Sequence, residues 1–295
     1  MTRSTIAEVT PQTKFSIYWL ISDSWLMAKR SITHIIRSMD QLVGLIMFPV
    51  MFTLLNKYVL GGAIAKSLPS NISYVNFLFA GVFIQTLAFG ANSTTINLAA
   101  DLKEGITDRF RSLPMSNSAL IIGHIIADLV RNILSGAIII VVALIIGFRP
   151  DASFIEWLQI IGLAMLFTLA ISWMSAILGL MVKTLEAAQW FGFVVIFPLT
   201  FISSAFVPTD TMPAGLRAFA ENQPLTKVMN AIRGLTLGQA TGNAITLSII
   251  WCVGLIVFAV PVTTCLKEDH KKAKNIYSLV NLIMIYFFHT ILHHD

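Results

Sequence analysis

Long apolar runs alternate with short polar segments along most of the chain. Residues 1–14 are a polar leader. Between residues 15 and 40, tryptophans mix with lysines and arginines, and apolar residues from Ile32 to Met39 recur at positions i, i+3, i+4 and i+7. This pattern predicts an amphipathic helix that lies at a membrane surface over residues 15–40.

Further along, the apolar runs are long enough to cross a bilayer, which requires roughly 17–25 residues per helix. They predict six spans, at about 41–60, 74–100, 132–148, 157–182, 187–207 and 244–266. The third span lies within a longer predicted helix, 119–148, whose first turns must project from the membrane. We therefore expect an all-α polytopic membrane protein, with one transmembrane domain over residues 15–266.

The distribution of basic residues predicts the orientation. Six spans place both ends of this domain on one side. If that side is cytoplasmic, fourteen of the 20 Lys and Arg residues lie inside, as the positive-inside rule requires. The remaining residues, 267–295, hold a basic cluster and an apolar stretch at 276–292 that either crosses the membrane or lies on it.

Composition excludes a soluble globular protein. The chain is 56% hydrophobic and only 12% charged, with a mean hydropathy of +0.78, whereas soluble domains carry about 25% charged residues. The net charge of +5 is spread between apolar runs, so we assign it to an anionic membrane face and expect no nucleic-acid partner.

Several catalytic motifs are missing from the sequence. It has no G-x-x-x-x-G-K-[ST] phosphate loop, no H-E-x-x-H, no C-x-x-C and no G-x-S-x-G, so we predict no catalytic residues, no metal site and no cofactor bound by this chain. Asp128 is the only carboxylate in the predicted long helices, which argues against an ion-driven pump. If the chain moves a substrate, the energy must come from a partner.

Two polar groupings allow alternative interpretations. The charged segment from Asp101 to Met115 is either a helix that docks on a soluble partner or a solvated loop. His124 and Asp128 share a helix face, as an acid–base pair would, but a structural cluster with Arg131 is the favoured interpretation. On the second span, Gln85, Asn92 and Asn97 either line a path or join helices; this choice stays open.

Three motifs in order carry a resemblance to a known family. The stretch 104–116, Glu-Gly-Ile-Thr-Asp-Arg-Phe-Arg-Ser-Leu-Pro-Met-Ser, resembles the cytoplasmic motif of ATP-binding-cassette type 2 exporter permeases, particularly the daunorubicin-resistance type. A second match is Gly123 with Ala127-Asp128. The third comprises Ser203 to Pro208, Met212-Pro213, Leu216, Pro224 and Ala231 to Leu235.

The resemblance, which covers residues 15–266, implies a role for each segment. Residues 15–40 would be the elbow helix and Thr209 to Arg233 extracellular re-entrant helices. The residues that would couple the permease to an ATPase are Glu104, Gly105, Asp108, Arg109, Arg111, Leu113, Pro114 and Met115. The residues that would form an extracellular gate are Ser203, Ser204, Phe206, Pro208, Met212, Pro213, Pro224 and Arg233.

The same resemblance implies the partners and the activity. The chain would dimerise with a second permease subunit, identical or different, and dock two cytoplasmic ATP-binding subunits that hold ATP and Mg. It would export a lipophilic, drug-like compound across a bacterial plasma membrane. Three alternatives are export of a glycolipid or lipid-linked polysaccharide, a membrane sensor that transports nothing, and a membrane enzyme using His124, Asp128 and Ser172 or Ser175.

Overall fold

The computed structural model describes residues 25–26, 28–30, 33, 39–64, 73–104, 119–182, 184–207, 209 and 212–268. Every regular element within these ranges is a helix. They are α2 (Met39–Leu55), a π-helical turn η1 (Asn56–Leu60), α3 (Gly61–Ile64), α4 (Tyr74–Lys103), α6 (Ala119–Ile146), α7 (Phe154–Met181), α8 (Leu185–Phe201), α9 (Ala214–Asn222), α10 (Pro224–Thr236) and α11 (Ala244–Glu268).

Within the described ranges, four helices are long and apolar enough to cross a membrane: α4, α6, α7 and α11. They make the chain an all-α, multi-pass membrane protein. Helices α2 and α8 are apolar but shorter, at 17 residues each. Most of the predicted surface helix, 15–40, lies outside the described residues, as do the leader 1–14 and the tail beyond residue 268.

Two expectations about the helices are wrong. Asp128 is not the only carboxylate in the long helices, because α4 continues to Lys103 and so includes Asp101, and α7 begins early enough to include Glu156. The apolar run 187–207 is not helical throughout, since α8 ends at Phe201 and a turn follows. The hydrophobicity of the sequence does not indicate where α8 ends. The helix ends just after Pro198, where the chain folds back onto α4.

The loop between α6 and α7 shows how local sequence sets the helix boundaries. Gly147 adopts a φ of 108°, which favours glycine and ends α6. Ser153 then caps α7: its hydroxyl accepts the N–H of Glu156, whose carboxylate accepts the N–H of Ser153 at 2.6 Å. This capping box fixes where α7 begins.

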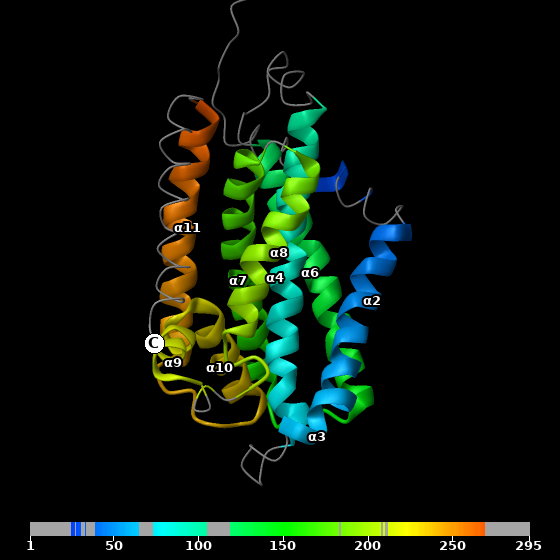
Figure 1. Ribbon diagram of the computed structural model, residues 1–295, viewed down its shortest axis with the longest axis vertical. Coiled ribbons are helices and arrows are strands. Elements are labelled where there is room, and N and C mark those ends of the chain that lie inside the picture. Colours follow the sequence, from blue (N-terminus) through cyan, green and yellow to red (C-terminus); the bar gives the residue numbers. More distant parts are fainter. Residues whose placement is uncertain are drawn as a thin grey trace, which may run out of the picture.

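The helices of the bundle stand side by side (Figure 1): α4, α7 and α11 run from the lower to the upper end of the picture, and α6 and α8 run back. Helix α4 is central and packs against α6, α7, α8 and α10, while α11 packs on the far side of α7. We call the end of the bundle that holds Lys103 the upper end, as drawn in Figure 1, and the end that holds α9 and α10 the lower end. The apolar core lies around the lower half of α4, with Phe79 stacked on Phe148 at 4.1 Å.

Candidate functional site

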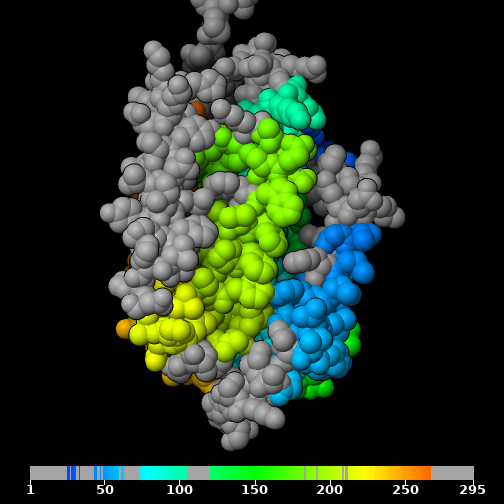
Figure 2. Space-filling model, in the orientation of Figure 1, coloured from blue at the N-terminus to red at the C-terminus, as the bar shows by residue number. Residues whose placement is uncertain are grey.

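A cavity of 410 Å³ lies between α2, α4, α6 and α8. Ligand pockets of roughly 300–1,000 Å³ hold drug-sized molecules, so this volume is sufficient for one. The residues that line it are Gly44, Pro49, Thr86, Phe89, Gly90, Ser93, Ile96, Asn97, Arg131, Ser135 and Phe193. Figure 2 shows α2 and α8 side by side on one face of the molecule, with a hollow between them.

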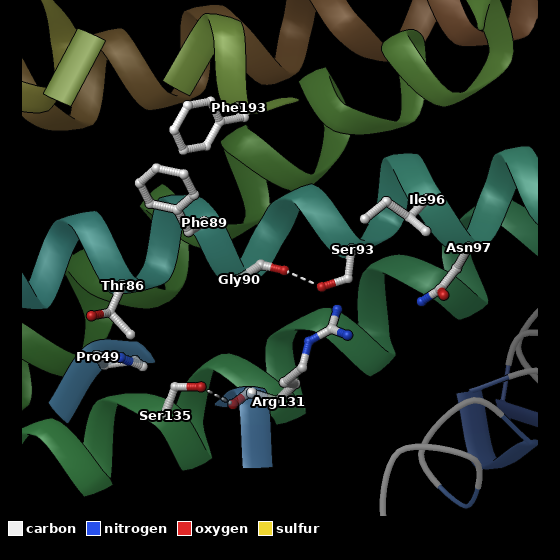
Figure 3. A pocket seen from close by; sticks show the side chains of 11 residues that line it. Pro49, Thr86, Phe89, Gly90, Ser93, Ile96, Asn97, Arg131, Ser135 and Phe193 are labelled. Atoms are coloured by element: carbon white, nitrogen blue, oxygen red, sulfur yellow. Dashed lines mark hydrogen bonds between the residues drawn. The ribbon is translucent and has the colours of Figure 1, made fainter. Parts of the chain in front are cut away.

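Among the described lining residues, Arg131 is the one that carries a charge. Arg131 projects from α6 toward α4, beside Ser93 (Figure 3), and is only 8% exposed. Ser93 Oγ donates to Gly90 O at 2.6 Å and Ser135 Oγ donates to Arg131 O at 3.1 Å. Each hydroxyl hydrogen is therefore already bonded to the backbone, which leaves the hydroxyl oxygens as acceptors in the cavity.

Behind the cavity, a buried carboxylate joins three helices. Asp128 pairs through Oδ1 with Nη2 of Arg131. Its Oδ2 accepts hydrogen bonds from Thr94 Oγ1 on α4 and from Ser172 Oγ on α7, the latter at 3.2 Å. Asp128 is 1% exposed, so these partners satisfy a charge that would otherwise be costly among apolar helices.

A second buried polar contact lies at the upper end of the bundle. His124 Nε2 of α6 lies 3.0 Å from Oδ2 of Asp101 on α4, and Nη2 of Arg30 lies 3.6 Å from Oδ1 of the same carboxylate. His124 thus bonds to Asp101 and not to Asp128. The membrane-enzyme alternative used His124 together with Asp128, whereas in the structure Asp128 bonds to Thr94, Ser172 and Arg131.

An aromatic row follows α8 from the cavity to the lower end. The ring of Phe89 lies 6.1 Å from that of Phe193 across the cavity wall (Figure 3). Phe193 stacks on Phe197 at 4.9 Å, Phe197 on Phe201 at 4.2 Å, and Phe201 lies 5.3 Å from Phe206. The row ends in the turn that follows α8.

At the lower end, Arg233 of α10 fastens this turn to α4. Its guanidinium carbon lies 3.9 Å from the centre of the Phe77 ring, its Nη2 donates to Ser204 O at 2.6 Å and its Nη1 donates to Asn230 Oδ1 at 2.9 Å. Ser204 Oγ donates to the same Asn230 oxygen at 2.9 Å. The structure therefore brings together two predicted gate residues, Ser204 and Arg233.

The turn also lies directly on the α4 backbone. A Cβ added at Gly81 would stand 2.7 Å from the carbonyl carbon of Ala205 and 2.8 Å from its Cα, so only glycine permits this approach. Ser203 Oγ lies 3.7 Å from Met229 Sδ, and Phe206 packs on Phe52 at 5.5 Å between ring centres.

The other predicted gate residues take different positions. Pro213 is the exposed N-cap of α9, and Pro224 is the first residue of α10, where a missing N–H is tolerated. Met212 donates its N–H to Thr209 O at 3.1 Å in the preceding turn. Pro208 lies outside the described residues.

Helix α9 carries an exposed ion pair. Arg217 Nε donates to Glu221 Oε1 at 2.7 Å, and Thr209 Oγ1 donates to the same oxygen at 3.3 Å. The hydrogen bond from Arg217 holds the pKa of Glu221 below its ordinary value of 4.5, and the nearby charges of Arg217 and Lys227 act in the same direction. The pair stiffens α9 across one helical turn.

Of the predicted coupling residues, Glu104 lies within the part of the chain that the structure describes. Glu104 is the exposed C-cap of α4 and donates its N–H to Ala100 O at 2.9 Å. Gly105, Asp108, Arg109, Arg111, Leu113, Pro114 and Met115 lie outside the described residues. The segment follows directly after Glu104, which lies three residues after the buried Asp101.

Sequence reasoning missed the partners that α4 supplies. Asp101 faces His124, Thr94 faces Asp128 and Gly90 lies against Asn132, so positions descend along α4 as they ascend along α6. This is the register of two antiparallel helices. The polar residues recur at matching intervals on the two spans, and this spacing could have indicated the pairing from the sequence. The lining residues Phe89 and Phe193 gave no signal, because aromatic residues occur throughout the spans.

The structure also separates the three polar residues of the second span. Asn97 lines the cavity. Asn92 lies against Gly192 of α8, where its amide occupies the space of a side chain. Gln85 is 2% exposed within α4 and does not line the cavity. One of the three therefore contributes to the cavity lining.

Comparison with known proteins supplies the family context. The profile of the ABC-2 type transporter family matches residues 23–237. A daunorubicin resistance ABC transporter permease protein of Streptomyces coeruleorubidus is 29% identical over 240 residues, which cover 79% of this chain and 84% of that protein. A probable doxorubicin resistance ABC transporter permease protein of Mycobacterium tuberculosis is 23% identical over 249 residues, covering 82% and 87%. Nodulation protein J of Rhizobium leguminosarum is 24% identical over 188 residues, covering 63% and 71%.

Proposed function

The chain belongs to the ABC-2 type transporter family, and on this premise we propose that it is the transmembrane permease subunit of an ATP-driven exporter that moves a lipophilic, drug-like compound out of the cell. The four long apolar helices provide the membrane-embedded body. Two relatives similar over most of this chain are drug-resistance permeases by name. The sequence contains no phosphate loop, so ATP and Mg belong on a separate subunit.

The proposed topology has six crossings with the upper end in the cytoplasm of a bacterial cell. Helices α2 and α8 supply the crossings beyond the four long helices; at 17 residues each they reach the lower bound of roughly 17 for a span. Helix α2 also continues through η1 and α3 to Ile64. The excess of basic residues in the segments of the upper end supports this orientation and a cytoplasmic N-terminus.

Each end of the bundle takes a role in the proposed transporter. At the upper end, Asp101 lies just before the coupling segment; the coupling segments of the permease dimer together dock two ATP-binding subunits. At the lower end, α9 and α10 form the re-entrant cap, fastened by Arg233. A second permease subunit, identical or different, completes the membrane unit. Closure of the ATP-binding subunits then shifts the population between two packings of the helices.

The composition of the cavity lining is the observation that supports a lipophilic substrate. Phe89, Ile96, Phe193 and Pro49 provide an apolar surface, while the polar groups are few, as in most small-molecule sites. The cavity adjoins α2 and α8, whose outer faces carry exposed apolar side chains such as Met47 and Trp190. A lipophilic molecule that enters the cavity from the bilayer therefore contacts apolar surfaces both outside and inside the cavity.

The test is ATP-dependent flux with every subunit supplied. Inverted membrane vesicles containing this chain and its ATP-binding subunits should accumulate a lipophilic dye when ATP is added. Reversing both charges at Asp108 and Arg111 should abolish co-purification of the ATPase and flux together. Exchanging Arg217 with Glu221 at the lower end is the matched control and should leave both intact. Well-folded wild-type protein with neither ATPase binding nor flux would sink the proposal.

A further inference from the structure

The guanidinium group of Arg131 retains hydrogen-bonding capacity inside the cavity. Arginine offers five N–H donors, and one terminal nitrogen, Nη2, pairs with Asp128. Nε has no hydrogen-bond partner among the described residues although it is buried. Because Asp128 already accepts bonds from Thr94 and Ser172, its carboxylate has limited capacity for further Arg131 donors.

The one charged group among the described lining residues, Arg131, favours one ligand class. Asp128 does not line the cavity, and none of the described lining residues is acidic. The hydroxyls of Ser93 and Ser135 direct their hydrogens to backbone carbonyls, so Arg131 and the Asn97 amide are the side-chain donors that remain. Among the described lining residues, a cationic amine finds no carboxylate, whereas an anion finds a guanidinium.

The surroundings strengthen such a contact. Arg131 is 8% exposed, and a charge pair in apolar surroundings attracts more strongly than one in water. Guanidinium groups bind carboxylate, sulfonate and phosphate oxygens through two parallel hydrogen bonds. The rings of Phe89 and Phe193 offer a surface for the apolar part of the same molecule.

We propose that the cavity binds lipophilic acids, with the anionic head on Arg131 and the apolar body against Phe89 and Phe193. This inference rests on the proposed export function and specifies its substrate class. An exported lipophilic acid and an anionic phospholipid from the surrounding bilayer share the required chemistry. Arg131 is then a specificity-determining residue of the cavity.

Two dyes with one aromatic skeleton test the proposal: neutral phenylnaphthylamine and its anionic counterpart, anilinonaphthalene sulfonate. Binding to the full-length permease in phosphatidylcholine nanodiscs is measured by fluorescence, with empty nanodiscs subtracted. We expect the sulfonate to bind about tenfold more tightly than the neutral dye, which corresponds to about 1.4 kcal/mol. Equal affinities would overturn the proposal.

Variants separate recognition from folding. Arg131→Met combined with Asp128→Asn removes both charges together and should erase the sulfonate preference while neutral-dye binding remains. Arg131→Lys keeps the charge without the planar fork and should retain a reduced preference. Arg217→Gln, which removes an exposed arginine of α9, is the matched control. An undiminished preference in the double variant, or in Arg131→Lys relative to wild type, would contradict the assignment.

Nanodiscs that also contain phosphatidylglycerol distinguish the two sources of the anion. If the lipid occupies the cavity, it weakens sulfonate binding to wild type but not to the double variant; if an exported acid is the occupant, binding is unchanged. These measurements need neither ATP nor the ATPase. Failure of the export proposal would instead appear as absent ATP-dependent flux of both dyes, neutral and anionic, in complete vesicles.

Discussion

His124 of α6 and Asp101 of α4 meet at the upper end of the bundle, with Nε2 and Oδ2 3.0 Å apart. Both side chains are buried, and Asp101 lies three residues before Glu104, where the described part of this segment ends. Any displacement of the segment that follows Glu104 therefore acts on α6 as well as on α4. The contact makes the two helices one unit at the surface where an ATPase would dock.

Replacing His124 with Ala should uncouple this unit. Loss of the partner leaves a buried carboxylate oxygen less satisfied, which should cost about 1–3 kcal/mol of stability. Dye binding in the cavity should persist, while ATP-dependent flux falls. Thermal unfolding and vesicle flux measured on one preparation check both parts. Normal flux with normal stability would show that the contact is dispensable.

Removing the carboxylate of Asp128 should be far more damaging. Asp128→Ala leaves the Arg131 charge without its ion-pair partner among apolar helices, and breaking a buried pair costs about 3–5 kcal/mol. Asp128→Asn with Arg131→Met removes both charges and should recover most of that loss. Unfolding of detergent-purified protein measures each variant. The idea fails if the double variant is as unstable as Asp128→Ala.

Arg233→Ala should loosen the lower-end cap. The change removes a charged hydrogen bond to Ser204 O and the stacking on Phe77, together about 2–4 kcal/mol. Faster amide exchange over 224–236 is expected, with little change in the upper half of α4. Arg233→Lys keeps the charge but not the planar stack and should be intermediate. Identical exchange in all three proteins would mean that Arg233 does not hold the cap.

Gly81→Ala tests how tightly the turn lies on α4. Its new methyl group would stand 2.7 Å from the Ala205 carbonyl carbon, so backbone must shift, and overpacking of this kind costs about 1–3 kcal/mol. Gly162→Ala on α7 is the control, since nothing lies within 4 Å of its Cβ position; it should raise stability by about 0.5–1 kcal/mol. Equal effects of the two changes would refute the close approach.

Acid should weaken α9 through Glu221. Its pKa in the folded protein is below the ordinary 4.5, so the unfolded chain binds the proton more readily. The stabilisation is thus present above pH 4.5 and is lost as pH falls through the lower, folded value. Unfolding of wild type and Glu221→Gln should differ slightly at neutral pH and converge in acid. A gap that widens in acid would reverse the sign.

The long helices were predictable because their apolar runs are longer than the apolar runs in helices of soluble proteins. The end of α8 was not, since the run continues past Phe201 and only the packing of Ala205 on Gly81 shows where the helix stops. For His124, helix spacing offered Asp128 as a local partner, but Asp101 of the neighbouring helix binds it. Contacts between helices decide such choices, and a single sequence does not state which helices are neighbours.

The aromatic row along α8 connects the cavity with the cap by ring contacts alone. Phe193 lines the cavity, and Phe206 lies in the turn that Arg233 fastens, with Phe197 and Phe201 in contact between them. Close-packed rings transmit a displacement because none can turn without moving its neighbour. If a bound molecule tilts Phe193, the neighbouring rings must shift with it, and occupancy of the cavity would then alter the packing of the turn that Arg233 holds.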